Sequence, residues 1–203
     1  MLPFRGRMET LDRAFAHRFS IMTARFTASR PCRADIKTAL RAGLNIKMIE
    51  GVLVDNIVFE KMARCSRRFS PLEAGGLVLG YRKDTYLHAI DVTLPSLWDK
   101  HSRSSFHRSP RAHRLRALRL WRKSGGLIDW IGEWHSHPSF SLSPSGTDHR
   151  NWKRLVRHRK AAMIFPICDG RDCELFLQAR FQIGPHKLAA FESDNLGTFF
   201  NAA

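Results

Sequence analysis

Residues 127–148 read LIDWIGEWHSHPSFSLSPSGTD, and this stretch carries the strongest structural signal in the chain. Its first eight residues are mostly apolar and predict a buried strand. Side chains two residues apart on a strand point to the same side, so His135 and His137 can present two imidazoles to one point in space. That arrangement is typical of a metal site.

A third metal ligand follows the two histidines. A catalytic zinc usually takes three protein ligands and leaves a fourth position for water. Pro138 and Pro144 bound a loop that can turn the chain back, and Ser145 then begins a helix whose first turn carries Asp148. The same SGTD sequence also fits a helix cap, in which Ser145 and Asp148 satisfy first-turn amides. Spacing alone leaves both interpretations of this segment open.

Strands and helices are predicted on both sides of this stretch. Upstream, the patterns predict strands at 52–58, 74–81 and 87–94, and a helix at 59–69. Downstream, helical spacing of Trp152, Leu155 and Val156 predicts a helix after Ser145, and strands follow at 161–168 and 174–183. This irregular alternation favours a mixed α/β sheet with helices against it.

The charge of the chain is strongly positive, with a formal net charge of +16 over 203 residues. Residues 100–128 hold nine Lys and Arg and no carboxylate, and a helix is predicted there from Ser109 and Pro110 to the SGG at 124–126. Nucleic acid is one partner that such a surface could bind. Aromatic interleaving is sparse, and Trp121 and Trp152 are expected to face the core, so an acidic protein partner is favoured.

Three segments are predicted along the chain. Residues 1–47 carry ten Lys and Arg against three acidic residues and show no sustained period, which predicts a weakly ordered basic arm that is dispensable for folding. Met48, just before the first convincing strand, is an alternative start of translation. Residues 48–190 are expected to form one catalytic domain, and 191–203 a C-terminal tail.

The four cysteines form no CxxC pair and no secretory leader precedes them, which favours a reduced, cytoplasmic protein. Cys168 and Cys173 are interpreted as small buried or half-buried thiols near a turn and not as a zinc knuckle. No apolar run has the length of a membrane-spanning helix, so no membrane association is expected.

The stretch from His135 to Asp148 resembles the JAMM metalloprotease signature, and every fixed position matches: HSHP, then seven residues between His137 and Ser145, then Asp148 three residues further on. The resemblance covers about residues 50–185. It implies the JAB1/MPN fold, a mixed β-sheet flanked by helices with a cytidine-deaminase-like zinc site at one strand end. His135, His137 and Asp148 would hold the zinc.

The same resemblance implies catalytic roles for further residues. Glu73, in PLEAGGLVLG, stands where the family has its general base, and Ser145 would donate to the oxyanion. The glycines at 75 and 76 are expected to let backbone approach closely beside the site. Glu133 is expected to orient a ligand from outside the metal shell. His149 and His158 are assigned to the surface. Arg108 could contact substrate, but membership of the basic surface is favoured.

The longer string WIGEWHSHPSFSLSPSGTDHRNW resembles a compact bacterial JAB group. That group includes deconjugases encoded with anti-phage CBASS operons and on mobile elements. The resemblance implies an isopeptidase that removes a ubiquitin-like modifier from its target, with a modifier conjugate, or an activating or conjugating enzyme of that pathway, as partner. A RadC-like, DNA-associated JAB protein is the alternative within the fold. A non-catalytic MPN scaffold is the other, although such scaffolds usually lose metal ligands that this chain keeps.

Overall fold

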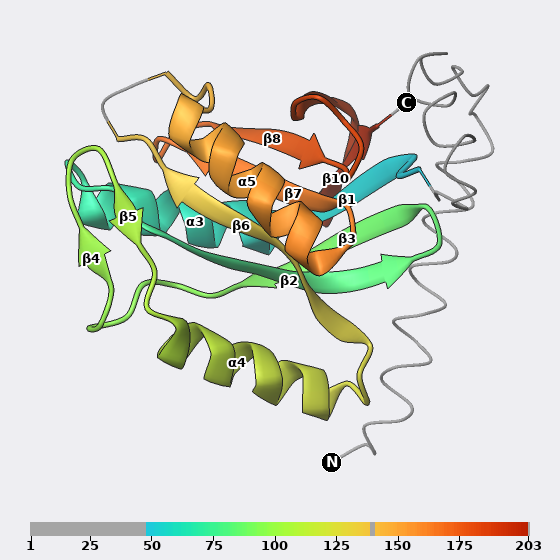
Figure 1. Cartoon of the computed structure of the whole chain (residues 1–203), viewed down its shortest axis with the longest axis horizontal. Coiled ribbons are helices and arrows are strands. Elements are labelled where there is room, and N and C mark those ends of the chain that lie inside the picture. Colours follow the sequence, from blue (N-terminus) through green and yellow to red (C-terminus); the bar gives the residue numbers. More distant parts are fainter. Residues whose placement is uncertain (1–47, 139–140, 203) are drawn as a thin grey trace. The chain divides into compact units, whose positions relative to one another are not determined.

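The computed structural model describes residues 48–138 and 141–202. The predicted arm, residues 1–47, lies outside the described residues. Helices and strands alternate irregularly along the described part (Figure 1), in the order β1 (Gly51–Asp55), α3 (Asn56–Phe69), β2 (Gly75–Lys83), β3 (Tyr86–Val92), β4 (Lys100–His101), β5 (Phe106–His107), α4 (Pro110–Lys123), β6 (Ile128–Ser136), α5 (Gly146–Arg159), β7 (Met163–Cys168), β8 (Cys173–Gln178), β9 (His186–Ser193) and β10 (Gly197–Asn201).

Eight of these strands form one mixed sheet in the order β1-β10-β9-β8-β7-β6-β2-β3. β1 pairs with β3 and β6 pairs with β7 in parallel, and the other pairs are antiparallel. The prediction of a mixed α/β sheet is therefore confirmed. Because β1 also pairs with β10, the sheet closes on itself, which the sequence patterns did not indicate.

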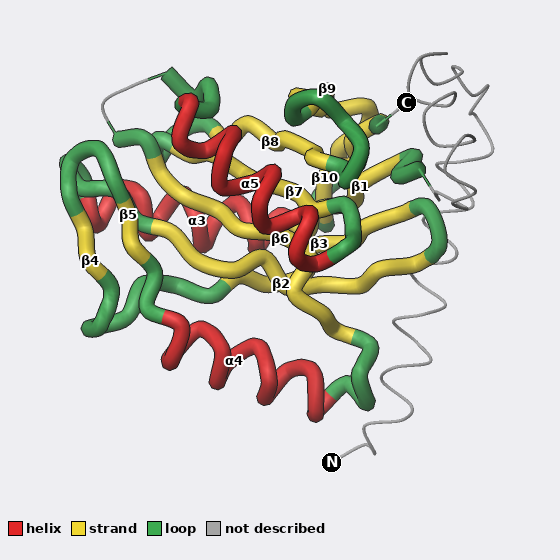
Figure 2. The backbone as a smooth tube through the Cα atoms, in the orientation of Figure 1, coloured by secondary structure: helices red, strands yellow, loops and turns green. Residues whose placement is uncertain are grey.

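Two apolar clusters cover opposite faces of the sheet. Alternate residues of β7 divide between them: Ile164 joins the cluster that includes α3, whereas Met163 and Phe165 join the cluster beneath α5. In α5, Trp152 and Val156 are buried, as their helical spacing predicts. Figure 2 shows α3 and α5 on either side of these strands. Burying both faces explains why β7, MIFPIC, is apolar at nearly every position.

The C-terminal segment is part of this sheet, which corrects the prediction of a tail at 191–203. β9 runs to Ser193, and β10 pairs with both β1 and β9. Phe199 is only 1% exposed. The five residues of β10, GTFFN, are too short for their alternation to stand out, and their partner β1 lies about 150 residues earlier.

Two further expectations are wrong. Cys168 and Cys173 face each other across the β7–β8 hairpin and form a disulfide, whereas Cys65 is a buried free thiol. Trp121 is 47% exposed and does not face the core, because α4 fully buries only His113. Among the described residues, no helix is both long and apolar enough to cross a membrane.

Buried polar contacts tie α4 and the segment before it to the sheet. The Asp99 carboxylate accepts the backbone N–H groups of Ser96 and Ser109 and lies 2.9 Å from Nε2 of His113. The other ring nitrogen of His113 lies 2.5 Å from Oγ1 of Thr93, at the end of β3. This network fixes both ends of the excursion that carries β4 and β5, which line the candidate site.

Candidate metal centre

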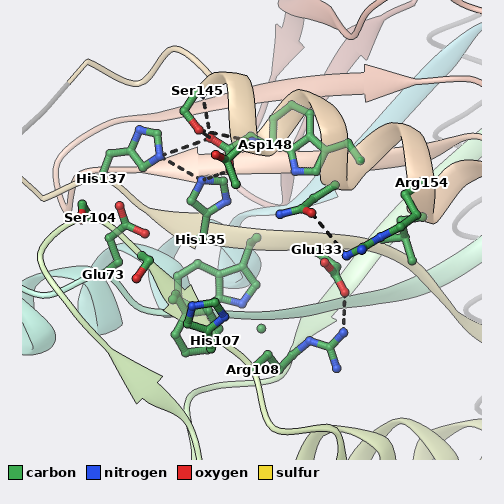
Figure 3. Close-up of a pocket in the computed structure, with 18 of the residues that line it drawn as sticks. Glu73, Ser104, His107, Arg108, Glu133, His135, His137, Ser145, Asp148 and Arg154 are labelled. Atoms are coloured by element: carbon green, nitrogen blue, oxygen red, sulfur yellow. Dashed lines mark hydrogen bonds and ion pairs between the residues drawn. The ribbon is translucent and has the colours of Figure 1, made fainter.

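Three potential metal ligands converge where β6 ends and α5 begins. His135 and His137 come from the end of β6, and Asp148 from the first turn of α5. The two Nε2 atoms lie 2.9 Å apart, and Asp148 Oδ1 lies 3.4 Å from Nε2 of His135. One ligand atom from each residue lies within 4.8 Å of the others. The structure thus brings together the three side chains that the sequence grouped (Figure 3).

His137 is held in one tautomer. Its Nδ1–H donates to the carbonyl oxygen of Ser141 at 2.9 Å, which leaves the lone pair of Nε2 facing His135 and Asp148. Burial lowers the pKa of His137 and so favours its neutral form. Two ring nitrogens and a carboxylate at these distances need a proton or a cation between them, so the arrangement suits a metal ion.

Asp148 serves as both helix cap and potential ligand, so the two interpretations of the SGTD segment hold together. Its Oδ2 accepts the backbone N–H of Ser145 at 2.7 Å and the Ser145 hydroxyl at 2.6 Å, while Oδ1 faces His135. Burial raises the pKa of Asp148, but hydrogen bonds and charge from His135 and the hydrogen bonds from Ser145 together hold it well below its usual range. The carboxylate is therefore ionised and available to a cation.

Strand register brings Glu73 beside the metal ligands. Gly75 of β2 pairs with His135, and Ala74 and Ser136 exchange two hydrogen bonds, so Glu73 lies near His137 (Figure 3). Glu73 is 7% exposed. Burial raises its pKa to about 7, although the charge of His135 opposes this rise and that of Asp148 adds to it. A carboxyl group with this pKa can accept and return a proton near neutral pH.

The raised pKa of Glu73 predicts a pH-dependent stability of the metal-free protein. Between its ordinary value of 4.5 and about 7, the folded chain holds a proton that the unfolded chain has lost. This contribution to stability is complete below pH 4.5 and is lost as the pH rises through 7. In urea unfolding, we expect metal-free Glu73→Gln to exceed the wild type by about 1–3 kcal/mol at pH 8 and by nothing at pH 4. An equal difference in the free energy of unfolding between variant and wild type at both pH values would contradict this prediction.

Residues 75 and 76 must be glycine because other parts of the chain lie too close to leave room for a Cβ, as expected. A Cβ at Gly75 would lie 2.6 Å from the carbonyl oxygen of Trp134 and 2.7 Å from the ring of Phe106. A Cβ at Gly76 would lie 2.0 Å from the carbonyl oxygen of Thr93. A larger residue at Gly75 would push β2 away from β6, the strand that leads to the histidines, and one at Gly76 would push β2 away from the segment after β3.

Glu133 has a different partner from the one expected. Its Oε1 accepts a hydrogen bond from Nη2 of Arg108 at 2.5 Å, and among the described residues neither His135 nor His137 bonds to it. The Arg108 guanidinium also lies 5.5 Å from the centre of the Trp130 ring. Arg108 is therefore a fixed residue of the site and not a loose member of the basic surface. Nothing in the sequence around Arg108 indicates that it pairs with Glu133.

A groove of about 1140 Å³ runs past the metal ligands. One wall is the segment Ser104–Arg108, and the other is the outward face of α5, with Asn151, Arg154 and His158. His149 lies outside the groove, exposed and stacked on Trp152. The metal ligands, Glu73 and Ser145 line the same groove, so an extended chain bound there would pass the proton-accepting carboxylate and the ligand cluster together.

The segment that builds this site is similar to proteins of known name. The family model described as prokaryotic homologs of the JAB domain matches residues 55–178. A "CD-NTase/cGAS isopeptidase" from Pseudomonas aeruginosa is 43% identical over 45% of this chain and 58% of that protein. A protein of the same name from Vibrio cholerae is 32% identical over 47% of this chain and 61% of that protein.

Two further relatives extend the comparison. A "probable metalloprotease" from Sinorhizobium fredii is 29% identical over 57% of this chain and 72% of that protein. The solution structure of a Desulfitobacterium hafniense protein matches with a TM-score of 0.52 and 26% identity, over 67% of this chain and 88% of that chain. The match to either isopeptidase spans less than two thirds of that protein's length.

Proposed function

Because the chain belongs to the family of prokaryotic JAB-domain proteins, we propose that it is a zinc-dependent isopeptidase. It would cleave a ubiquitin-like modifier, or a modifier-like C-terminus, from a lysine of a target protein. The observation that carries the proposal is the convergence of His135, His137 and Asp148 beside the buried carboxyl group of Glu73. This combination offers a metal site and a proton acceptor in one groove.

The ligand cluster fits zinc. Ligand atoms about 2.0–2.2 Å from a tetrahedral zinc lie about 3.3–3.6 Å from one another. The two Nε2 atoms lie 2.9 Å apart and Oδ1 of Asp148 lies 3.4 Å from Nε2 of His135, and one ligand atom from each of the three residues lies within 4.8 Å of the others. A bound zinc would need the two imidazoles to move slightly apart. Two imidazoles and one carboxylate match a catalytic zinc site that keeps one position open. A zinc ion held there would supply Lewis acidity, which polarises a carbonyl group and activates water.

Glu73 would act first as the general base and then as the general acid of the reaction. It accepts a proton from the attacking water and later delivers it to the leaving lysine amine, for which a pKa near 7 is well suited. Ser145 would donate its hydroxyl to the developing oxyanion. Its proton is directed to Asp148 in this structure, so the hydroxyl must rotate before it can donate to substrate.

The groove supports a peptide-like substrate. An isopeptide bond joins an extended C-terminal segment to a flexible lysine side chain, and the groove runs past the ligand cluster between the segment Ser104–Arg108 and the outward face of α5. The names of the relatives support a conjugate in a CD-NTase system as substrate. We place the enzyme in a bacterial anti-phage or mobile-element conjugation pathway, acting beside its activating and conjugating enzymes.

The proposal predicts metal-dependent cleavage of an isopeptide bond. Purified protein with one equivalent of zinc should hydrolyse a substrate in which the C-terminal carboxyl group of a CD-NTase is joined to the amine of a reporter lysine. Mass spectrometry should show the free reporter and a CD-NTase with an intact C-terminus. A chelator should abolish the release and added zinc should restore it, because the ligand cluster binds the metal reversibly. Cleavage that is insensitive to chelation, or zinc-loaded protein that cleaves no isopeptide-linked or linear fusion substrate, would refute the assignment.

A further inference from the structure

The β4–β5 hairpin bonds both backbone polar groups of Glu73. The N–H of Glu73 donates to the carbonyl oxygen of Ser102 at 2.8 Å. The carbonyl oxygen of Glu73 lies 2.7 Å from Nδ1 of His101, which must be the donor because a carbonyl oxygen only accepts. Glu73 precedes β2, which begins at Gly75, so no strand ladder holds it there. The hairpin takes the place of that ladder.

The imidazole of His101 is itself fixed. It is stacked on Phe69 with ring centroids 4.6 Å apart, and it contacts Phe106 at 5.1 Å. Phe106 in turn lies against Gly75, where a Cβ would meet its ring. The end of α3, the hairpin and the start of β2 therefore meet around one imidazole, which has a single hydrogen to offer at Nδ1.

These contacts determine where the carboxyl group of Glu73 points. On one side, Ala74 is tied to Ser136, between the two histidines, by two hydrogen bonds. On the other side, the N–H of Leu72 donates to the carbonyl oxygen of Phe69, and the hairpin bonds both backbone polar groups of Glu73 itself. The peptide group after Glu73 is held at both ends, with its carbonyl oxygen bonded to His101 and its N–H bonded to Ser136. Loss of the His101 bond would leave the carbonyl end free to tilt and would shift the carboxyl group relative to the ligand cluster. A displacement of about 1 Å is enough to lower a catalytic rate about a hundredfold.

We propose that His101 is a positioning residue: by donating to the carbonyl oxygen of Glu73, it holds that side chain toward the metal centre. Its effect on turnover rests on the proposed function, whereas its effect on the backbone of Glu73 does not. Residues 104–108 of the same excursion line the groove. The segment that lines the groove is thus continuous with the segment that would orient the proton acceptor.

Two substitutions separate the hydrogen bond from the packing. His101→Phe keeps a ring between Phe69 and Phe106 but removes the donor, whereas His101→Asn places an amide N–H near the position of Nδ1. At equal zinc content, we expect His101→Phe to lower kcat about 10–100-fold with little change in KM, because orientation and not binding is lost. His101→Asn should recover most of kcat. His186→Phe, which changes an exposed histidine on β9, is the matched control.

Amide hydrogen exchange of the metal-free full-length protein gives a readout without turnover. The N–H of Glu73 should exchange faster in His101→Phe than in the wild type and should be protected again in His101→Asn. Wild-type kcat and protection in His101→Phe, or equal impairment of both variants, would overturn the role of His101. If the wild type cleaves no conjugate, the proposed function fails, and the exchange measurement still decides whether His101 holds Glu73.

Discussion

Glu73→Gln should lower isopeptide hydrolysis by about a hundredfold or more, the usual scale for loss of acid-base catalysis. The substitution keeps the shape of the side chain but removes its ability to take a proton from water. Its backbone bonds to the hairpin involve no side-chain atom and should persist. Zinc content should be unchanged, because His135, His137 and Asp148 are untouched. Turnover at matched zinc occupancy, with metal content measured by elemental analysis, checks both expectations.

Glu133→Gln is the matched control for that experiment, since it changes a second carboxylate in the same groove. Its partner is Arg108, so its loss should release that guanidinium and alter substrate affinity more than kcat. If Glu133→Gln abolishes cleavage while Glu73→Gln remains near the wild type, the general base is misassigned. The raised pKa of Glu73 would then reflect burial alone.

The local parts of the site could be predicted because they depend on short-range geometry. Strand periodicity places His135 and His137 on one side of β6 whatever surrounds them. A helix cap fixes Asp148 relative to Ser145 within one turn, and the cap is present. The role of Glu73 came from the resemblance to a known family. Its place beside the histidines depends on the β2–β6 register, which sequence periodicity does not contain.

The parts that could not be predicted depend on contacts between distant segments. The pairing of β1 with β10 joins residues about 150 positions apart, and nothing in GTFFN indicates its partner. Arg108 and Glu133 are 25 residues apart and meet only because the excursion after β3 folds over the groove. The expectation that Trp121 faces the core failed because α4 fully buries only His113, and its polar contacts with the rest of the chain include those of His113 with Thr93 and Asp99 and of Arg116 with Asp91.

Asp148→Asn should lower zinc affinity by at least about a hundredfold, because loss of groups that merely orient a metal ligand already costs about 10–100-fold. The two oxygens of Asp148 have separate partners, which makes this substitution informative. With its amide oxygen in the place of Oδ2, the introduced asparagine can still accept from the N–H and hydroxyl of Ser145. Its amide nitrogen then faces His135 in the place of Oδ1 and cannot bind a cation.

Comparison with Asp148→Ala separates the metal ligand from the helix cap. Alanine removes both the metal ligand and the cap acceptor. The free energy of unfolding of metal-free Asp148→Ala should therefore be about 1 kcal/mol lower than that of metal-free Asp148→Asn. Zinc titration should show equal loss of affinity in the two variants, since neither keeps the carboxylate. Asp129→Asn, which alters a partly exposed carboxylate paired with Arg159, should bind zinc like the wild type. If Asp148→Asn binds zinc as tightly as the wild type, Asp148 is a helix cap alone, and the third ligand must be sought elsewhere in the groove.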